Sequence, residues 1–458
     1  MFQRRFCKVL ATTMNDSDSS DLSSYASESS SDAFETNLNA SNDARSNTPR
    51  DSVIQKLPAR QKSNDESVVP FATIKVESQM IVEGDALTVK ISPDKLAYAV
   101  GLSNGVIRIF FVDKQINENN VIALKSPKEK LPCNDMCFID SSSKPFSKKS
   151  PNLLAVYSSG YIRLWDCFNQ VAQATMIFEV FESADPCDFN LISEEGTVAN
   201  ELLCVALSMD ATRFVTGGSD TIIKVYDLTT RLRLLNLKSG SRTYLTKECT
   251  HHTSRISALV YHPRGKNDPM YSHIFVSASW DQTIQIWDDR KVASLWHYYG
   301  PQVVGSDGLD IDGMQNIIVA ASWVRSGVML KMWKFADFSI TGSSLAAKRK
   351  ILQNYSKPVN EVALEGSEST TQGYVARIGG EGRYIFYAGY GMNILKVIDR
   401  ESMSIVTGLT DLPNAVYSLD SCLDPRDKRR CLLVFTNTKN VYLASVQSRS
   451  TFLEVSTA

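Results

Sequence analysis

The sequence predicts an all-β fold in which seven related units follow an N-terminal tail. Three observations support this prediction: short runs of Val, Ile, Leu, Tyr and Phe alternate with Gly, Asn, Asp and Ser, no long stretch has helical periodicity, and one pattern recurs seven times. Short apolar runs between turn residues are typical of antiparallel strands. The 458 residues suffice for one large domain or for several ordinary ones.

The recurring pattern begins with small residues, continues through a polar turn and an alternating strand, and ends with an aromatic residue and an acid. Its clearest copies are VSASWDQTIQIWD, which ends at Asp288, and VTGGSDTIIKVYD, which ends at Asp227. A further strand precedes each copy, and a more variable fourth completes the unit. The aromatic position of the seven copies falls at Phe110, Trp165, Tyr226, Trp287, Trp333, Ile398 and Ala444. Since the last two copies rest on apolar alternation alone, a count of six units is the alternative.

A single sheet of this kind exposes two edges and an apolar face. Seven sheets arranged radially bury their faces against one another and leave only short edges. Closing such a ring requires an outer strand for the last sheet. The segment FATIKV (71–76) and the C-terminal segment FLEV (452–455) are the two candidates, and the sequence leaves both open.

Over roughly residues 71–458 these repeats resemble the WD40 repeat family. In the best copy His252, Ser277, Asp281 and Trp287 match by spacing the family's buried hydrogen-bond tetrad. An Asp at a tight turn accepts from backbone N–H groups and from an imidazole, which bridges to a hydroxyl and an indole N–H. The resemblance implies a seven-bladed β-propeller that acts as a non-enzymatic scaffold or adaptor for protein interactions in an intracellular multiprotein complex.

Residues 1–70 are predicted to form a disordered tail, because serine and acidic residues dominate there and aromatic residues are scarce. The whole chain carries 49 Lys and Arg against 50 Asp and Glu, so it lacks the basic field typical of nucleic-acid-binding proteins. It contains no apolar run long enough for a transmembrane helix or a signal peptide. We therefore expect an intracellular protein, cytoplasmic and/or nuclear, that binds neither nucleic acid nor membranes. Its oligomeric state is left open.

Catalytic motifs are absent from the sequence, which contains no G-x-x-x-x-G-K-[ST], H-E-x-x-H or G-x-S-x-G pattern. Histidines concentrate in one repeat, but His252 belongs to the tetrad and His262 to a turn, and no acid or thiolate stands at ligand spacing. Cys133 and Cys137 are expected on one face of a strand as small buried residues. We predict no catalytic, metal-binding or cofactor-binding residues. A propeller enzyme, with an acid or metal cluster in its central channel, is the minor alternative.

The resemblance also implies a partner-binding face around the central channel. Side chains just before the turn Asp face it, as do side chains that flank the first buried position of each inner strand. The first set is Ser103, Ser158, Ser219, Trp280 and Trp323, and the second is Leu87, Leu203, Arg255, Ser257, Asp307 and Tyr417. Trp280 and Trp323 are the strongest candidates, because Trp, Tyr and Arg dominate interface energies. The alternative is that both indoles pack locally over neighbouring loops.

Trp287, Asp288 and Arg290 match the W-D-x-R signature by which many propellers resemble substrate receptors of cullin-4 ubiquitin ligases. Asp289 departs from the apolar residue that is usual before the Arg. The alternative is that Arg290 caps the end of its strand through Asp288 or Asp289. The long loop 336–373, with the basic run AAKRK at 346–350, is a second and weaker candidate for partner contacts.

Overall fold

The structure, a computed structural model, describes residues 72–112, 121–140, 152–167, 175–184, 198–238, 251–323, 328–336, 357–364 and 366–448. The chain divides into two units, Met1–Glu66 and Ser67–Ala458, and every described residue belongs to the second. The predicted tail at 1–70, the candidate edge segment at 452–455 and the basic run at 346–350 lie outside the described residues.

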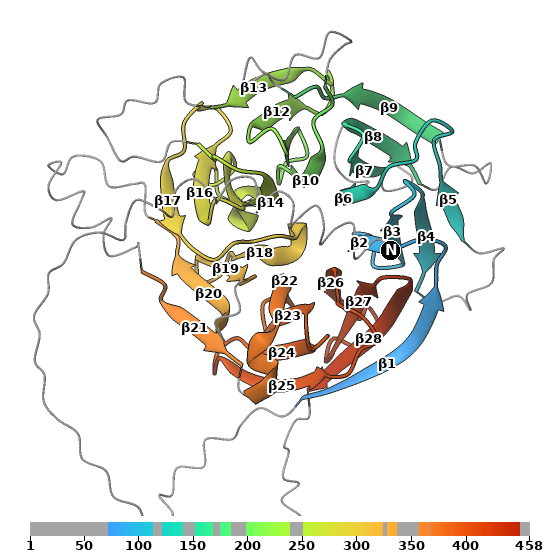
Figure 1. Cartoon of the computed structure of the whole chain (residues 1–458), viewed down its shortest axis with the longest axis vertical. Coiled ribbons are helices and arrows are strands. Elements are labelled where there is room, and N and C mark those ends of the chain that lie inside the picture. Colours follow the sequence, from blue (N-terminus) through green and yellow to red (C-terminus); the bar gives the residue numbers. More distant parts are fainter. Residues whose placement is uncertain are drawn as a thin grey trace, which may run out of the picture. The chain divides into compact units, whose positions relative to one another are not determined.

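The described residues form seven four-stranded antiparallel sheets, which stand around a common axis as the blades of a propeller (Figure 1). The predicted all-β fold with seven repeats is therefore confirmed. Within the described part of the chain the helices are short 3-10 turns, and none is long and apolar enough to cross a membrane.

The first six blades each contain four strands that are consecutive in the chain, with the first strand innermost in Figure 1. Blades one to three consist of β2 (Ala86–Ile91), β3 (Ala97–Leu102), β4 (Ile107–Phe111), β5 (Ile122–Leu124); β6 (Cys133–Ile139), β7 (Asn152–Tyr157), β8 (Tyr161–Asp166), β9 (Thr175–Phe181); β10 (Leu202–Leu207), β11 (Arg213–Gly218), β12 (Ile223–Asp227) and β13 (Arg233–Leu237). Blades four to six consist of β14 (Ile256–Tyr261), β15 (Ile274–Ser279), β16 (Thr283–Asp288), β17 (Trp296–Tyr299); β18 (Leu309–Asp312), β19 (Ile317–Ala321), β20 (Val328–Lys334), β21 (Asn360–Ala363); β22 (Gln372–Gly379), β23 (Tyr384–Tyr390), β24 (Leu395–Asp399) and β25 (Ser404–Leu409).

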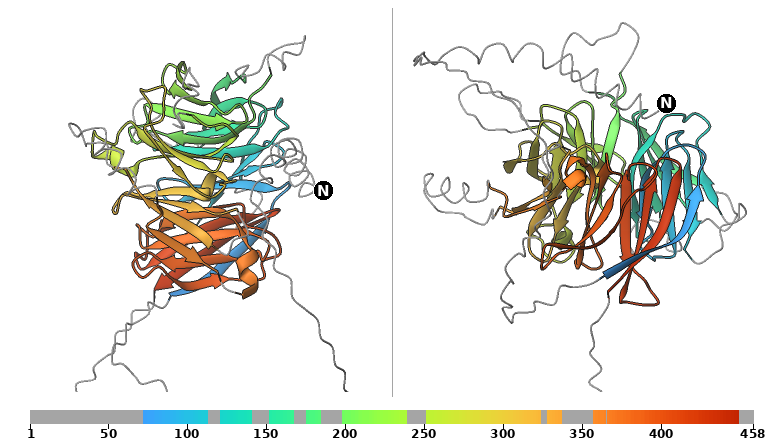
Figure 2. Two further views of the ribbon diagram at one scale, coloured as in Figure 1. Left: turned by 60° about the vertical axis from the view of Figure 1, so that its left-hand side comes forward. Right: turned by 60° about the horizontal axis from the view of Figure 1, so that its bottom comes forward.

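The seventh blade joins the two ends of the ring. Its strands are β26 (Ser418–Leu423), β27 (Arg430–Asn437), β28 (Asn440–Ser448) and, outermost, β1 (Ala72–Ile81). β1 runs antiparallel to β28 from the Ala72–Ser448 pair to the Ile81–Asn440 pair, with a bulge between Val76 and Ser78. Figure 2 shows β1, in blue, beside the red strands of this blade. Of the two candidates for the closing strand, the structure has the N-terminal one.

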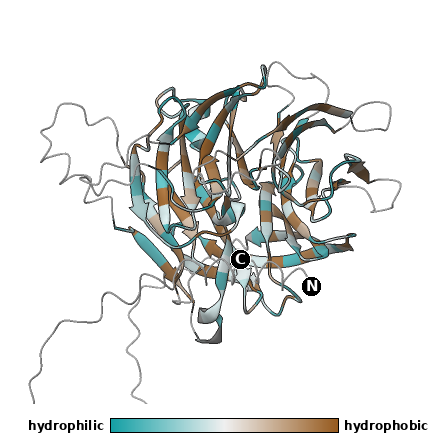
Figure 3. Cartoon of the chain, turned by 45° about the horizontal axis from the view of Figure 1, so that its top comes forward, coloured by the Kyte–Doolittle hydropathy of each residue, from teal (hydrophilic) through white to brown (hydrophobic). Residues whose placement is uncertain are grey.

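The core lies between neighbouring blades. Buried side chains of adjacent sheets form shared clusters, such as the one that combines Ile284 and Ile286 of the fourth blade with Ile318 and Trp333 of the fifth. β3, β7 and β15 are buried along their whole length. Figure 3 shows brown, apolar stretches along the strands of the sheets. Each blade thus depends on its neighbours to cover its apolar faces.

The expectation that Cys133 and Cys137 share one strand face is wrong. A bulge between Cys133 and Asp135 shifts the register of β6, so that Cys133 is paired with Tyr157 and Cys137 with Leu154, an odd number of residues away. The two thiols therefore point to opposite faces. Cys133 packs in the cluster toward the first blade, and Cys137 packs in the cluster toward the third.

Removal of residues 1–81 deletes β1 and leaves the backbone N–H and C=O groups on the outer edge of β28 without partners, while β27 still pairs with its inner edge. We expect this truncated chain to aggregate, whereas a chain that starts at Ala72 keeps every described strand and stays soluble. Size-exclusion chromatography with light scattering compares the two. A soluble 82–458 chain with an unchanged melting temperature would contradict the role of β1 in closing the ring.

His262 connects the fourth blade to the fifth. Its Nε2 lies 2.7 Å from Oδ1 of Asn316, its ring stacks on Tyr271 with centroids 4.1 Å apart, and Phe335 meets it edge-on at 4.8 Å. The side chain is fully buried, and this burial lowers the pKa of His262 to about 4. The folded protein therefore holds the neutral imidazole.

Stability should fall as the pH drops from about 6.5 to about 4, because the unfolded chain protonates His262 in this window and the folded chain does not. Between pH 7.5 and pH 5 this residue alone costs the wild type roughly 2 kcal/mol of unfolding free energy. His262→Gln keeps a donor for Asn316 and loses that much less. Urea unfolding followed by circular dichroism at both pH values measures the difference, and equal losses in the two proteins would refute this role.

Candidate partner-binding face

The structure brings the four tetrad residues together at one end of the fourth blade. The imidazole of His252 lies between Asp281 and Ser277: Nδ1 is 2.9 Å from Oδ2 of Asp281, and Nε2 is 2.6 Å from Oγ of Ser277. The indole N–H of Trp287 donates to the same Oγ at 2.7 Å. All four side chains are therefore hydrogen-bonded in the interior of the blade.

Asp281 also organises the tight turn between β15 and β16. Its carboxylate accepts from the backbone N–H groups of Thr253 and Thr283, each at 2.9 Å. Burial acts to raise the pKa of Asp281, but the hydrogen bond and the charge interaction with His252 outweigh it, and the net pKa lies below the ordinary value. The group is a carboxylate, which fixes both the turn and the imidazole.

Other blades build a different polar centre at the same place. In the third blade Glu182, fully buried, stands where the fourth has its imidazole. It accepts from Thr216 Oγ1 at 2.7 Å, from the Tyr226 hydroxyl at 2.8 Å and from Lys224 Nζ at 3.0 Å. In the second blade Glu129 pairs with buried Arg163. In these two blades an ion pair between a carboxylate and a base thus takes the place of the imidazole.

Sequence reasoning missed these acid–base pairs, although a regular spacing in the chain indicates three of them. An acid stands three or four residues before the inner strand, and a base stands two residues before the aromatic position. The pairs formed in this way are Arg108–Glu83, Arg163–Glu129 and Lys396–Glu368. This spacing occurs in the first, second and sixth blades, whereas Glu182 of the third blade lies much farther before β10 and does not follow it.

Trp280 occupies the turn of the fourth blade, on the side of the ring where the inner strands begin. We call this side the Trp face, since the turn with Trp323 lies on the same side of the fifth blade. Trp280 is half-buried, and the guanidinium of Arg255 lies over its ring, 5.5 Å from the centroid. Arg255 is also bonded to Glu201 at 2.8 Å. The indole is therefore partly covered by its own chain.

Trp323 packs into a group of aromatic rings, the aromatic cluster, whose members are Trp323, Tyr374, Tyr390 and Tyr417. The centroid of the Trp323 ring is 4.8 Å from that of Tyr374 and 6.4 Å from that of Tyr390. Tyr374 and Tyr417 meet at 5.3 Å in a T-shaped contact. Tyr374 is buried and the other three are half-buried. Both indoles are therefore packed locally, as in the alternative above, while each keeps exposed surface.

The remaining predicted contact residues divide into two groups. Half-buried side chains that reach the Trp face are Ser103, Ser158, Ser219, Leu87, Leu203, Arg255 and Tyr417. Ser257 and Asp307 are only 2% and 1% exposed. The Ser257 hydroxyl donates to the carbonyl of Val303, and Asp307 pairs with Lys90. Direct partner contacts by Ser257 and Asp307 do not fit this burial, because the Ser257 hydroxyl is bonded to Val303 and Asp307 is paired with Lys90 across the central channel.

Charged side chains of the inner strands and of helix η4 (Ser306–Gly308) interact across the central channel. They are Lys90, Asp135, Asp307, Asp310, Arg377 and Asp420. Lys90 contacts Asp307 and lies 3.7 Å from Asp135, and Arg377 lies 3.8 Å from Asp310. Burial raises the pKa of Asp135 and of Asp420.

These carboxylates connect neighbouring inner strands. Asp135 accepts from the backbone N–H of Val205 at 3.1 Å, and Asp310 accepts from that of Ile378 at 2.9 Å. Asp420 accepts from the N–H of Ile91 at 2.7 Å, from the seventh blade to the first. The cluster is of the kind that the enzyme alternative requires. Its contacts favour a structural role, because the oxygens are engaged in joining blades.

On the opposite side of the ring, Arg290 forms two parallel bonds to Asp288, from Nε at 2.8 Å and from Nη2 at 2.9 Å. Burial acts to raise the pKa of Asp288, but the bonds from Arg290 outweigh it and the net pKa is lowered. This geometry corresponds to the strand-end cap that was the alternative to the ligase-receptor motif.

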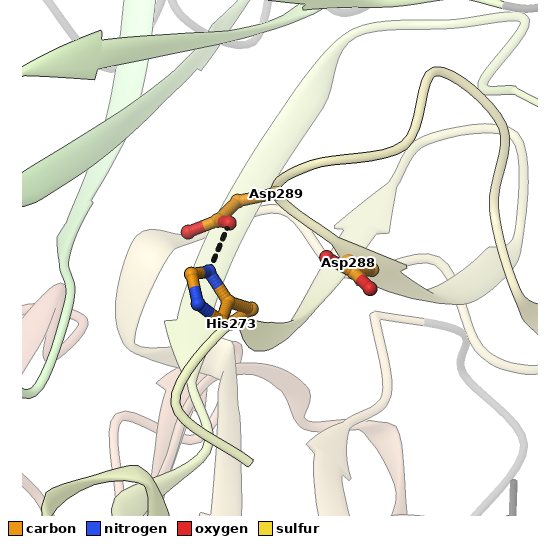
Figure 4. A group of neighbouring side chains, drawn as sticks. All are labelled: His273, Asp288 and Asp289. Carbon is orange, nitrogen blue, oxygen red and sulfur yellow. Dashed lines mark hydrogen bonds and ion pairs between the residues drawn. The ribbon is translucent and has the colours of Figure 1, made fainter. Parts of the chain in front are cut away.

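His273, Asp288 and Asp289 come close enough together for a metal-binding group (Figure 4). His273 Nδ1 lies 2.7 Å from Oδ1 of Asp289, while Oδ2 of Asp289 accepts from the Tyr261 hydroxyl at 3.0 Å and pairs with Arg213 at 2.9 Å. With Asp288 held by Arg290, the oxygens that a cation needs are already paired with cationic or hydroxyl donors. The group therefore fits a network of ion pairs at the ends of strands.

Replacement of Asp281 by Ala removes acceptors from His252 and from two backbone N–H groups. We expect a loss of roughly 3 kcal/mol of unfolding free energy, at about 1 kcal/mol or more for each unsatisfied donor. Urea denaturation measures it. Glu401→Ala, a change at an exposed acid, is the matched control and should cost less than about 0.5 kcal/mol. A loss of that same small size for Asp281→Ala would show that the tetrad does not stabilise the blade.

A model of the family "WD domain, G-beta repeat" matches residues 193–227 and 243–288, which include β10 to β12 and β14 to β16. Over 81 residues the chain is 35% identical to histone acetyltransferase type B subunit 2 of Aspergillus fumigatus. This alignment covers 18% of the chain and 16% of that protein, so only a small part of either is matched. The matched repeats, their recurrence along the sequence and the seven four-stranded blades make the chain a member of the WD40 repeat family.

Proposed function

We propose that the protein is a non-enzymatic scaffold or adaptor in an intracellular multiprotein complex, cytoplasmic and/or nuclear, and that the Trp face binds a protein or peptide. The observation that carries this proposal is the pair of half-buried indoles, Trp280 and Trp323, in the turns of adjacent blades on one side of the ring. Large aromatic side chains that are held rigidly by their own chain lose little entropy on binding and dominate interface energies.

The similarity to a named subunit supports membership in a complex. The aligned Aspergillus protein is named as a subunit, which is consistent with a place for this chain in a multiprotein complex. The carboxylates of the central channel are the groups that a propeller enzyme would require. Here they join neighbouring blades and are paired with Lys90 and Arg377.

The double variant Trp280→Ala, Trp323→Ala tests the face. The tagged variant and the wild type are expressed in the cells that naturally produce the protein, and co-purified proteins are quantified by mass spectrometry. We expect a defined subset of partners to fall at least about tenfold in the variant, in line with the cost of losing interface tryptophans. Circular dichroism establishes that the variant is folded.

The matched control is the double variant Met270→Ala, Met314→Ala, which changes two exposed apolar residues, 60% and 69% exposed, on the opposite side of the ring. It should keep the partners that the Trp variant loses. Identical partner sets for wild type and Trp variant would overturn the assignment of the Trp face, and loss of the same proteins in both variants would point to a general defect.

A further inference from the structure

Each blade ends in an outer strand with one edge that faces away from the ring. In the second blade this strand is β9, the last in the order β6-β7-β8-β9. Alternate residues of an edge strand direct their backbone N–H and C=O groups away from the sheet. Within the part of the chain that the structure describes, no strand pairs with this edge of β9. Its backbone groups can therefore accept a further strand.

The other outer strands are protected against a foreign strand by their length, charge or composition. β5 has three residues, and β17 and β21 have four each. β1 carries Lys75 and Glu77, β13 begins with Arg233, and β25 contains Gly408, a residue type that weakens a strand. Each of these edges thus has a feature that discourages pairing.

β9 lacks most of this protection. Five of its seven residues, TMIFEVF, are apolar, and the carboxylate of Glu179, its one charged residue, accepts from Nε of Arg163 at 2.6 Å. A bulge between Met176 and Phe178 leaves the stretch Phe178–Phe181 in regular register with β8. The edge is therefore apolar, regular over these four residues, and free of lysine, arginine and proline.

Exposed apolar side chains lie along the same edge. Met176 and Phe181 of β9 are 43% and 42% exposed. The chain just before β13 lies beside β9 on the outer rim (Figure 1), where the guanidinium of Arg231 is 5.0 Å from the ring centroid of Phe178. Leu232, the next residue, is 65% exposed. A strand added to β9 thus finds apolar side chains against which its own can pack.

We infer that the outer edge of β9 binds an extended segment of a partner protein, which pairs with it as a fifth strand of the second blade. This inference goes beyond the proposed function, because the edge lies on the outer wall of the ring and not on the Trp face. In such pairing the backbone hydrogen bonds provide affinity, and alternate side chains of the added strand provide specificity. Here the apolar side chains of the segment would pack on Phe181 and Leu232.

A second copy of the chain is the other strand that could pair with this edge. Two copies would meet antiparallel through the regular stretch 178–181, and therefore through four residues on each side. Stable interfaces between folded proteins use about 20 to 30 residues on each side, so this contact is too small for a dimer. A flexible segment can follow both the edge and the apolar residues beside it, which favours a peptide segment as the occupant.

Hydrogen–deuterium exchange of the free, full-length protein tests whether the edge is open. We expect about half of the amides of β9 to exchange within seconds, because alternate N–H groups have no partner. The amides of β8, which is paired on both sides, should stay protected. Full protection of β9 would show that another part of the chain already covers the edge, and the inference would then be wrong.

A phage-displayed library of random peptides supplies defined probes for the edge. The full-length protein is the target, and the Met176→Lys, Phe181→Lys variant is used for counter-selection. We expect the recovered peptides to alternate apolar and polar residues. In synthetic copies, N-methylation then removes one backbone N–H at a time. Methylation at every second position should weaken binding at least about tenfold in isothermal titration calorimetry, and methylation between these positions should have little effect, because only alternate N–H groups of an added strand point at β9.

Three variants of the protein locate the site. Met176→Lys, Phe181→Lys places two charges at the edge and should weaken the peptides about tenfold or more. Both side chains are exposed, so we expect the variant to fold, which circular dichroism verifies. Ile405→Lys, at a 40% exposed position of the outer strand β25, is the matched control and should leave the affinity unchanged. Trp280→Ala, Trp323→Ala should also bind the peptides normally, because the Trp face is a different surface.

The opposite results would contradict the inference in distinct ways. Equal binding to the lysine variant, or loss of binding in the Trp variant, would place the peptides elsewhere. Methylation effects that do not alternate would exclude strand pairing, and recovery of no peptide would also count against it. A wild-type dimer in light scattering that the lysine variant lacks would make a second copy the occupant. The scaffold function is decided separately, by the co-purification of partners with the Trp face variant.

Discussion

The pairing of β1 with β28 is the interaction on which the rest of the structure depends. Each blade leaves apolar faces that only its neighbours cover, so the seven sheets stabilise one another as a closed series. An open ring would expose the face of a terminal blade and the edge of a strand. Ten residues of β1 prevent this by adding an outer strand to the last sheet. Near the axis, the carboxylates of Asp135, Asp310 and Asp420 also help to hold the ring closed, because they join inner strands of adjacent blades.

The repeated pattern allowed the blades to be predicted from sequence, because strand alternation and turn residues are local properties. The hydrogen bonds among His252, Ser277, Asp281 and Trp287 follow the spacing of a single repeat for the same reason. Two features escaped prediction. The bulge in β6 reverses the side of Cys137, and alternation alone does not show a bulge. Glu182 replaces a histidine from a position that an insertion separates from β10, so spacing did not reveal it.

The pattern of a single repeat predicted the positions of the candidate-site residues but not their surroundings. The sequence placed Trp280 and Trp323 in turns, and their turns do lie on one side of the ring. Their surroundings come from other parts of the chain: Arg255 covers Trp280, and Tyr374 and Tyr390 of the next blade pack on Trp323. Ser257 and Asp307 have the sequence positions of surface contacts, yet both are buried, Ser257 bonded to Val303 and Asp307 paired with Lys90 across the channel. Such contacts between blades depend on how the sheets pack, and no single repeat encodes them.

The closing strand also sets an order of events during synthesis. β1 leaves the ribosome before any other strand of the propeller, and its partner β28 is completed only at Ser448. The earliest strand must therefore wait, unpaired, until nearly the whole propeller has been translated. Contacts between segments this far apart in sequence form slowly, since a long loop must be closed first. The nascent chain thus carries an unpaired strand for most of its synthesis, and unpaired strand edges are prone to aggregation.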